Sequence, residues 1–230
     1  MKTATHFAAA AIAALAMASI AHAQTLTEAP DRVNQCRNGA FPGMAVSYEQ
    51  ARLRGDARLI ADDRFDDAHR WDPNSCPSDD ASLCRVSAAV KAGTTVLVAN
   101  HYRGYACVFV PGRDDAGWVA DNRLTPLPRP RPATAAWSGR WRNADDVITV
   151  TRGRDGALHV SGKAVWHGGH DNDHFGDVDF TARPVETRLI SPPGDACRVE
   201  LIQLGAYLIV RDNAGCGGVN VRFNGIYTHG

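Results

Sequence analysis

The sequence has little of what a nucleic-acid-binding protein needs. Lys and Arg together number 25, as do Asp and Glu, so the formal net charge is zero. A chain without net charge offers no strong field to nucleic acid or to acidic lipid. Aromatic residues make up only 7% of the chain and do not alternate with a basic cluster. These two shortages argue against nucleic acid as a partner.

Long apolar runs are also scarce. The clearest, residues 7–20, follows Lys2 and precedes an Ala-His-Ala triplet that ends at Ala23. A basic start, an apolar centre and a small-x-small cleavage site make up a secretory signal peptide, so we predict a leader over residues 1–23 and a periplasmic or secreted protein. No second run approaches the roughly 20 apolar residues that span a bilayer. We expect a soluble protein with no membrane insertion after signal cleavage.

A recognisable catalytic constellation is missing as well. Ser161 lies in the sequence Val-Ser-Gly-Lys, which lacks the strand-turn-helix context of a nucleophile elbow. Adjacent acids such as Asp145 and Asp146 are ordinary in turns. We therefore predict that the protein is not an enzyme and has no catalytic residues and no cofactor.

Six cysteines are present, all beyond the leader. An even number of cysteines in an oxidising compartment indicates disulfides. The C-terminal half holds two, which should pair with each other. The N-terminal half holds four, for which three connectivities are open, and we favour one short and one long bond. The predicted pairs are Cys197–Cys216, Cys76–Cys84 and Cys36–Cys107.

A proline-rich segment divides the chain. Four prolines alternate over residues 126–132, which favours extended polyproline geometry. We predict a linker over 129–136 that joins a domain at 33–128 to a second domain at 137–230. Few contacts should cross such a linker.

The first domain is predicted to be mostly strands. Ser47 and Gln50 have capping-box spacing and predict a short helix that ends at Gly55. A strand is possible at 57–61. From Cys84 onward, five short apolar runs separated by turn residues predict a small closed β-barrel.

Several motifs in residues 84–128 resemble the bacterial SH3 domain. They are Lys-Ala-Gly-Thr at 91–94 before a Val-x-Val run, a Tyr-Ala-Cys-Val strand at 105–108, Gly-Trp-Val at 117–119 and Arg-Leu at 123–124. The resemblance implies a binding or docking module for cell-wall material. It makes Tyr102 and Trp118 the candidate ligand-binding residues. For Trp118 we favour a core role over ligand contact, and Tyr102, in a loop between two strands, is the better candidate.

The sequence predicts strands and turns throughout the second domain. Alternation is clearest at 219–224, where Val219, Val221 and Phe223 should share one face. Seven or eight antiparallel strands predict a barrel or a sandwich, and we favour the closed barrel because closure removes exposed edges. The predicted fold class is therefore all-β, with an SH3-like small barrel followed by an antiparallel barrel of seven or eight strands.

The start of the second domain carries a second resemblance. Its Gly139-x-Trp141 motif and the hairpin that follows are similar to the opening of the calycin barrels, the lipocalin and avidin group. The resemblance implies that Trp141 plugs one end of a barrel. A ligand would then bind at the other end or on the outer face.

The most polar segment lies at 167–174. Three histidines and two aspartates there suit Zn²⁺ or Ca²⁺, but the same residues describe a solvated loop between strands, and we predict the loop and no metal.

The sequence favours an exported, non-enzymatic binding protein of the bacterial cell envelope. Its expected partner is cell-wall material or another exported protein. Two alternatives stay open. One is a periplasmic inhibitor or immunity protein against a lysozyme-like or toxin enzyme. The other is a metal-assisted hydrolase that uses the segment at 167–174.

Overall fold

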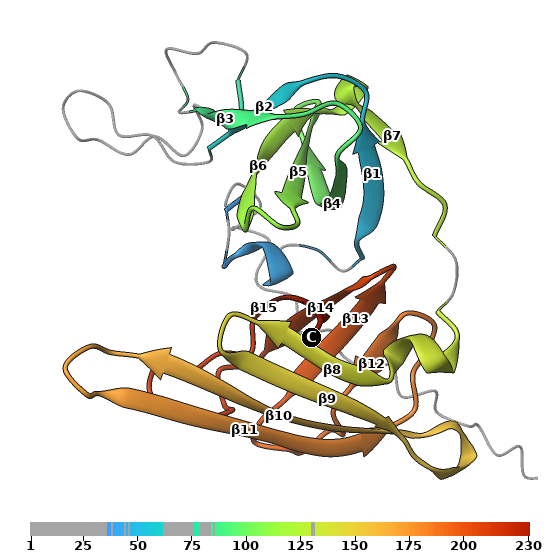
Figure 1. Cartoon of the computed structure of the whole chain (residues 1–230), viewed down its shortest axis with the longest axis vertical. Helices are drawn as coiled ribbons and strands as arrows, with labels where there is room; N and C mark the ends of the chain where they lie inside the picture. The colour runs from blue at the N-terminus through green and yellow to red at the C-terminus, as the bar shows by residue number, and fades with distance from the viewer. Residues whose placement is uncertain are drawn as a thin grey trace, which may run out of the picture.

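The computed structural model describes residues 36–37, 39–43, 45, 47–61, 76–78, 84, 86–129 and 132–230. Within them the chain is all-β, and its only helical segments are short 3-10 turns (Figure 1). These turns are η2 (Phe41–Gly43), η3 (Asp121–Arg123), η4 (Thr134–Trp137) and η5 (Arg154–Gly156).

Two antiparallel sheets form the molecule, which we call the N-terminal sheet and the C-terminal barrel. The N-terminal sheet has the order β3-β2-β6-β5-β4-β1-β7. Its strands are β1 (Glu49–Leu53), β2 (Ala57–Ile60), β3 (Val86–Val90), β4 (Thr95–Tyr102), β5 (Tyr105–Val110), β6 (Asp115–Ala120) and β7 (Leu124–Pro126).

The C-terminal barrel has eight strands in the order β11-β10-β9-β8-β15-β14-β13-β12 and is nearly closed. Its strands are β8 (Gly139–Asn143), β9 (Asp146–Arg152), β10 (Leu158–His167), β11 (Asp173–Ala182), β12 (Arg188–Ile190), β13 (Val199–Leu204), β14 (Tyr207–Asp212) and β15 (Gly225–His229). The predicted all-β fold class is confirmed.

Large apolar side chains pack the interior of the barrel. Trp141 has no exposed surface, its indole Nε1 donates to the carbonyl oxygen of Trp137 at 2.9 Å, and its ring lies 3.7 Å from that of His229. Buried side chains from β9, β10, β11, β13 and β14 complete the same cluster. An eight-stranded barrel is just wide enough for side chains to fill. A ligand of this barrel is therefore expected on its outside.

The long connection between β14 and β15 runs along the edge of β11. Gly176 and Gly217 form an isolated antiparallel bridge, and the N–H of Asp177 donates to the carbonyl of Cys216 at 3.1 Å. A Cβ on Gly176 would lie 2.4 Å from that carbonyl oxygen, so only glycine permits this close approach. The connection thus covers part of the edge that an open barrel would leave exposed.

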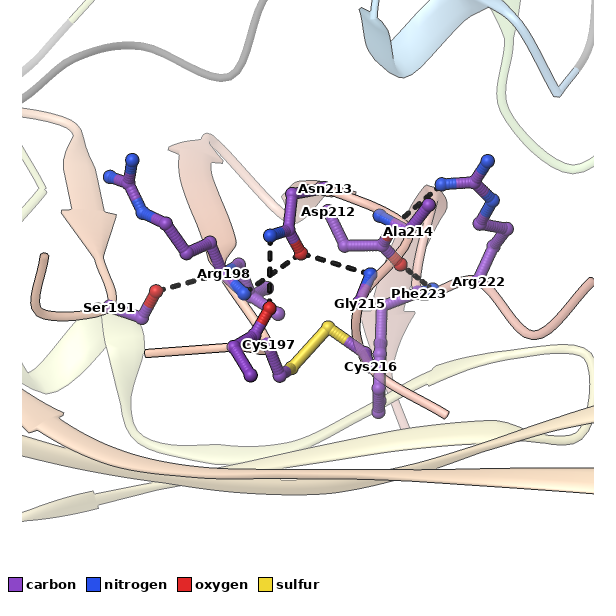
Figure 2. Close-up of a disulfide and its surroundings, with 12 residues drawn as sticks. Ser191, Cys197, Arg198, Asp212, Asn213, Ala214, Gly215, Cys216, Arg222 and Phe223 are labelled. Carbon is purple, nitrogen blue, oxygen red and sulfur yellow. Dashed lines mark hydrogen bonds and ion pairs between the residues drawn. A yellow bond between two sulfur atoms is a disulfide. The ribbon is translucent and has the colours of Figure 1, made fainter. Parts of the chain in front are cut away.

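The alternation at 219–224 is the main strand prediction that is wrong. The last strand begins only at Gly225, Val219 is 70% exposed, and Asn220 has a φ of 68°. Side-chain hydrogen bonds replace the ladder here (Figure 2): the carboxylate of Asp212 accepts from the N–H of Phe223 at 2.5 Å. Apolar residues two apart can therefore point inward from an irregular segment that an aspartate holds in place.

The helix predicted from Ser47 to Gly55 is also wrong, because β1 occupies Glu49–Leu53. Ala51 and Leu53 are buried as expected, but they share a face at the two-residue period of a strand. β1 pairs with both β4 and β7. Pairing on both sides outweighs a local capping signal, since tertiary context overrides propensity.

All three predicted disulfides are present, and the described residues contain no free cysteine. Cys36 and Cys107 are 1% and 0% exposed. The bond between Cys197 and Cys216 fixes the β14–β15 connection to the start of β13 (Figure 2). Disulfides of this kind indicate an oxidising, exported location.

The two sheets meet through the segment from Cys36 to Tyr48, which we call the N-terminal arm. Phe41 and Tyr48 of the arm join a buried cluster with Ile202 and Ile209 of the barrel and with side chains of β4, β5 and β6. Figure 1 shows the helical turn η2 of the arm, in blue, between the two sheets. The two halves are therefore in buried contact with each other. The arm packs against both sheets, so the N-terminal sheet and the barrel are held together by side-chain packing as well as by the proline-rich segment of the chain.

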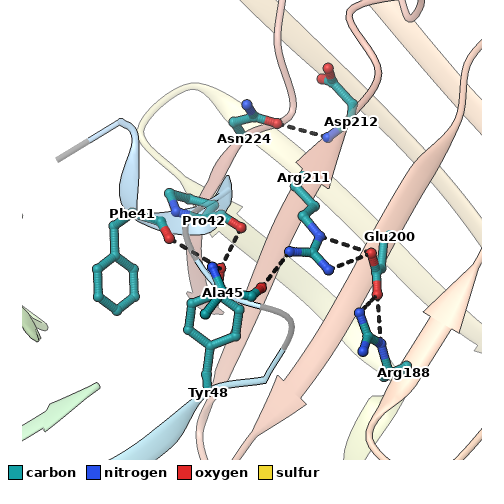
Figure 3. Close-up of polar contacts among 9 residues, drawn as sticks. All are labelled: Phe41, Pro42, Ala45, Tyr48, Arg188, Glu200, Arg211, Asp212 and Asn224. Atoms are coloured by element: carbon teal, nitrogen blue, oxygen red, sulfur yellow. Dashed lines mark hydrogen bonds and ion pairs between the residues drawn. The ribbon is translucent and has the colours of Figure 1, made fainter. Parts of the chain in front are cut away.

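A buried ionic network lies at this interface (Figure 3). Arg211, 1% exposed, donates from Nε to Glu200 at 2.8 Å and from Nη1 to the carbonyl of Ala45 at 2.7 Å. Arg188 also donates to Glu200, which has no exposed surface. Nearby, burial raises the pKa of Tyr48 to about 12. The network ties the arm to the outer face of β13 and β14.

Candidate functional site

The two ligand-binding residues predicted from the sequence lie close together but differ in exposure. The rings of Tyr102 and Trp118 are 6.1 Å apart. Trp118 has no exposed surface and belongs to the cluster between the sheets, so in this structure it is a core residue. Tyr102 is half-buried, and the guanidinium of Arg103 lies 4.9 Å from the centre of its ring. Only Tyr102 retains surface that a ligand can reach.

A larger concave surface lies on the barrel, over the outer face of β8 to β11. Residues along β11 alternate strictly between exposed and buried over 175–180. Val178 and Phe180 point into the core, while Phe175, Asp177 and Asp179 point out. Phe175 is 64% exposed and is the one aromatic residue among the exposed large apolar residues of the part of the chain that the structure describes.

The strand register aligns outward side chains into rows across the four strands. One row is Arg140, Thr149, Ser161 and Asp179, from β8 to β11 in order. Residues directly opposite each other in neighbouring strands lie about 5 Å apart, so each row forms a continuous polar strip. The first row therefore presents a guanidinium, two hydroxyls and a carboxylate in sequence.

The next rows bring apolar side chains beside this strip. Val147 lies opposite Lys163, and Lys163 lies opposite Asp177. Val165 lies opposite Phe175. The surface is thus polar at one end and apolar at the other.

Together these rows line a groove of about 610 Å³, which we call the outer-face groove. Its lining residues are Arg140, Asp145, Val147, Thr149, Ser161, Gly162, Lys163, Val165, Phe175, Gly176, Asp177, Val178 and Asp179. A volume of this size falls within the range of small-molecule sites, roughly 300 to 1,000 Å³.

The charged groups of the groove are partly paired. Lys163 Nζ lies 2.9 Å from Asp177 Oδ1, and His159 Nε2 lies 3.2 Å from Asp179 Oδ1. Within the described part of the chain, the hydroxyls of Thr149 and Ser161 make no hydrogen bond to protein. The groove therefore offers donors and acceptors of both charges together with free hydroxyls.

The polar segment at 167–174 extends the hairpin. His167 ends β10 and Asp173 begins β11, so only residues 168–172 form the turn. The ring of His167 contacts two carboxylates, with Nδ1 2.9 Å from Asp173 and Nε2 3.1 Å from Asp145. His174 instead lies against Trp166, with ring centres 5.0 Å apart. Among the described residues, no three His, Cys, Asp or Glu side chains are grouped as metal ligands.

We expect His167 to titrate above its ordinary range, because hydrogen bonds to Asp173 and then Asp145 raise its pKa. The stabilisation from these bonds is present below about pH 6.5, the ordinary pKa of histidine, and is lost as the pH rises through the raised value. An NMR titration of the ring proton should give a higher midpoint in the wild type than in Asp173→Asn. Asp177→Asn is the control and should match the wild type. Equal midpoints in wild type and Asp173→Asn would contradict the assignment.

A half-buried carboxylate supports the apolar end of the groove through the backbone of β10. Asp146 accepts from the N–H of Val165 at 2.9 Å, and burial raises its pKa. Tyr227, whose hydroxyl donates to the carbonyl of Phe223 at 3.0 Å, also has a pKa raised by burial. Both groups position the barrel wall behind Val165.

Sequence reasoning missed the outer-face groove because its residues come from four strands and form no local motif. One signal was available. Phe175 and Val165 fall on the polar face once the alternation of β10 and β11 is assigned, and neighbouring apolar residues on an outer face are the kind of patch that can mark a binding surface.

Comparison with protein-family models, with characterised proteins and with solved structures gave no match. In the part of the chain that the structure describes, no helix is long and apolar enough to cross a membrane.

Proposed function

We propose that the protein is an exported, non-enzymatic binding protein of the bacterial cell envelope, with cell-wall material as its partner. The observation that carries this proposal is the outer-face groove beside the exposed ring of Phe175. The barrel interior is packed with side chains, so recognition on this domain takes place outside.

Two further features support the proposal. Three disulfides indicate an oxidising compartment, which agrees with the predicted leader at 1–23 and with a periplasmic or secreted location. The resemblance of residues 84–128 to bacterial SH3 domains implies a wall-binding module, to which Tyr102 would contribute.

Co-sedimentation with purified insoluble peptidoglycan tests this function. The mature protein, with its disulfides intact, should pellet with peptidoglycan. Cellulose, an insoluble polysaccharide that is not part of peptidoglycan, is the control, and with it the protein should stay in the supernatant. Equal partition to both polymers, or no pelleting, would count against a wall-binding role.

Inhibition of a wall-degrading enzyme is a second candidate function. The hairpin of β10 and β11 projects beyond the neighbouring β8–β9 turn (Figure 1). A projecting hairpin has a shape that can enter the cleft of an enzyme. A lysozyme assay separates the candidates, because an inhibitor lowers the rate at a stoichiometric ratio, whereas a wall binder needs enough protein to cover the substrate.

A further inference from the structure

We propose that the outer-face groove binds a saccharide chain that carries N-acetyl groups, with the ring of Phe175 as the stacking platform. This inference rests on the proposed function and names the part of the wall that is recognised. It is carried by the position of the groove, by the chemistry of its lining and by the exposure of one aromatic ring.

The position of the groove favours side-chain recognition. Peptides commonly bind to sheets by adding a strand to an open edge. Here the groove lies on the face of the sheet, where β9 and β10 are paired on both sides. At β11 the bridge between Gly176 and Gly217 covers part of the edge. The backbone N–H and C=O groups under the groove are therefore largely bonded to neighbouring strands, and a ligand must be bound by side chains.

The polar lining matches a ligand that has many hydroxyls and little charge. Arg140 and Lys163 oppose three aspartates, so the groove has no strong excess of one sign. Thr149 and Ser161 add groups that both donate and accept. A polyanion would be repelled by the aspartates and a polycation by the basic groups, whereas the hydroxyls of a sugar can bond to every group in the strip.

The apolar end supplies the remaining contact. An exposed aromatic face offers a large, rigid area at low entropic cost. Phe175 lies beside Val165 and diagonally from Lys163, so a sugar ring on Phe175 is within reach of the paired Lys163 and Asp177. Val147 and Val165 provide apolar surface that suits the methyl of an acetamido group.

Calorimetry with tri-N-acetylchitotriose, a soluble β-1,4-linked N-acetylglucosamine oligomer, tests the assignment on the full mature protein. Phe175→Ala should weaken binding by about tenfold or more, because it removes the stacking surface. Phe175→Tyr should retain binding. The matched control is Val185→Ala. Val185 is also an exposed apolar residue, at 68%, but it lies outside the groove, so this variant should bind as the wild type does.

Four outcomes separate this inference from the proposed function. Loss of both peptidoglycan and chitotriose binding in Phe175→Ala supports both. Peptidoglycan binding without chitotriose binding, or without an effect of Phe175→Ala, overturns the saccharide assignment and leaves the wall function standing. Chitotriose binding through Phe175 without peptidoglycan binding supports the groove and contradicts the wall function. Binding of a wall stem peptide in place of the sugar overturns the assignment.

Discussion

Replacing Glu200 by Leu is expected to lower the free energy of unfolding by about 3 to 5 kcal/mol, the usual result of breaking a buried ion pair from one side. Glu200 has no exposed surface and accepts hydrogen bonds from both Arg188 and Arg211. Without the carboxylate, the Arg211 guanidinium is buried with the carbonyl of Ala45 as its remaining partner among these residues. Loss of the carboxylate costs less free energy at Arg188, because its side chain is 22% exposed and its guanidinium can be hydrated.

The double variant Glu200→Leu/Arg211→Met tests the cause. If an uncompensated buried charge explains the loss, removing that charge should restore at least half of the stability, since apolar replacements of buried pairs are often neutral. Urea denaturation followed by tryptophan fluorescence measures both variants. Lys91→Met, which breaks an exposed pair with Asp56, should match the wild type. A double variant no more stable than Glu200→Leu would contradict this explanation.

Removal of the disulfide between Cys36 and Cys107 is expected to cost about 4 kcal/mol. The two residues are 71 positions apart, so the bond closes a long loop in the unfolded chain. Closing this loop lowers the conformational entropy of the unfolded state and thereby stabilises the folded protein. The same relation gives about 3 kcal/mol for Cys197–Cys216, with a separation of 19, and about 2.5 kcal/mol for Cys76–Cys84, with a separation of 8.

Paired Cys→Ala variants measured by urea denaturation test this ranking. The variant at Cys36 and Cys107 should also lose contact between the arm and both sheets, because the bond lies in the cluster that joins them. If the short Cys76–Cys84 loop proves to be the costliest to open, chain entropy is not the main contribution and the ranking is wrong.

The sequence predicted the all-β fold and the strands of the barrel wall well, because both depend on local pattern. β10 is an example, since its apolar residues are two apart and one face is buried. β1 was misassigned as a helix for the opposite reason. Whether residues 49–53 form a helix or a strand is decided by β4 and β7, which follow more than 40 positions later. Counting predicted the Cys197–Cys216 pair, but for the four N-terminal cysteines it left three connectivities open.

The candidate site was predicted less well than the fold. Tyr102 and Trp118 were chosen from a resemblance. The structure shows how they differ, since Trp118 is fully buried and Tyr102 is half-buried. The groove depends on register, which places Arg140 and Asp179 in one row across four strands. No pattern within a single strand encodes that alignment, although an apolar Phe175 among polar neighbours hints at it.

The arm also sets the order in which the molecule can be completed. Ala45 and its hydrogen-bond partner Arg211 are separated by 166 positions, so their contact cannot form until nearly all of the chain has been synthesised. Contacts of such long range are slow to form. The N-terminal sheet can assemble while the barrel is still emerging, but the arm's second face stays uncovered until β13 and β14 arrive. Docking of the two halves is therefore expected to be a late event of folding.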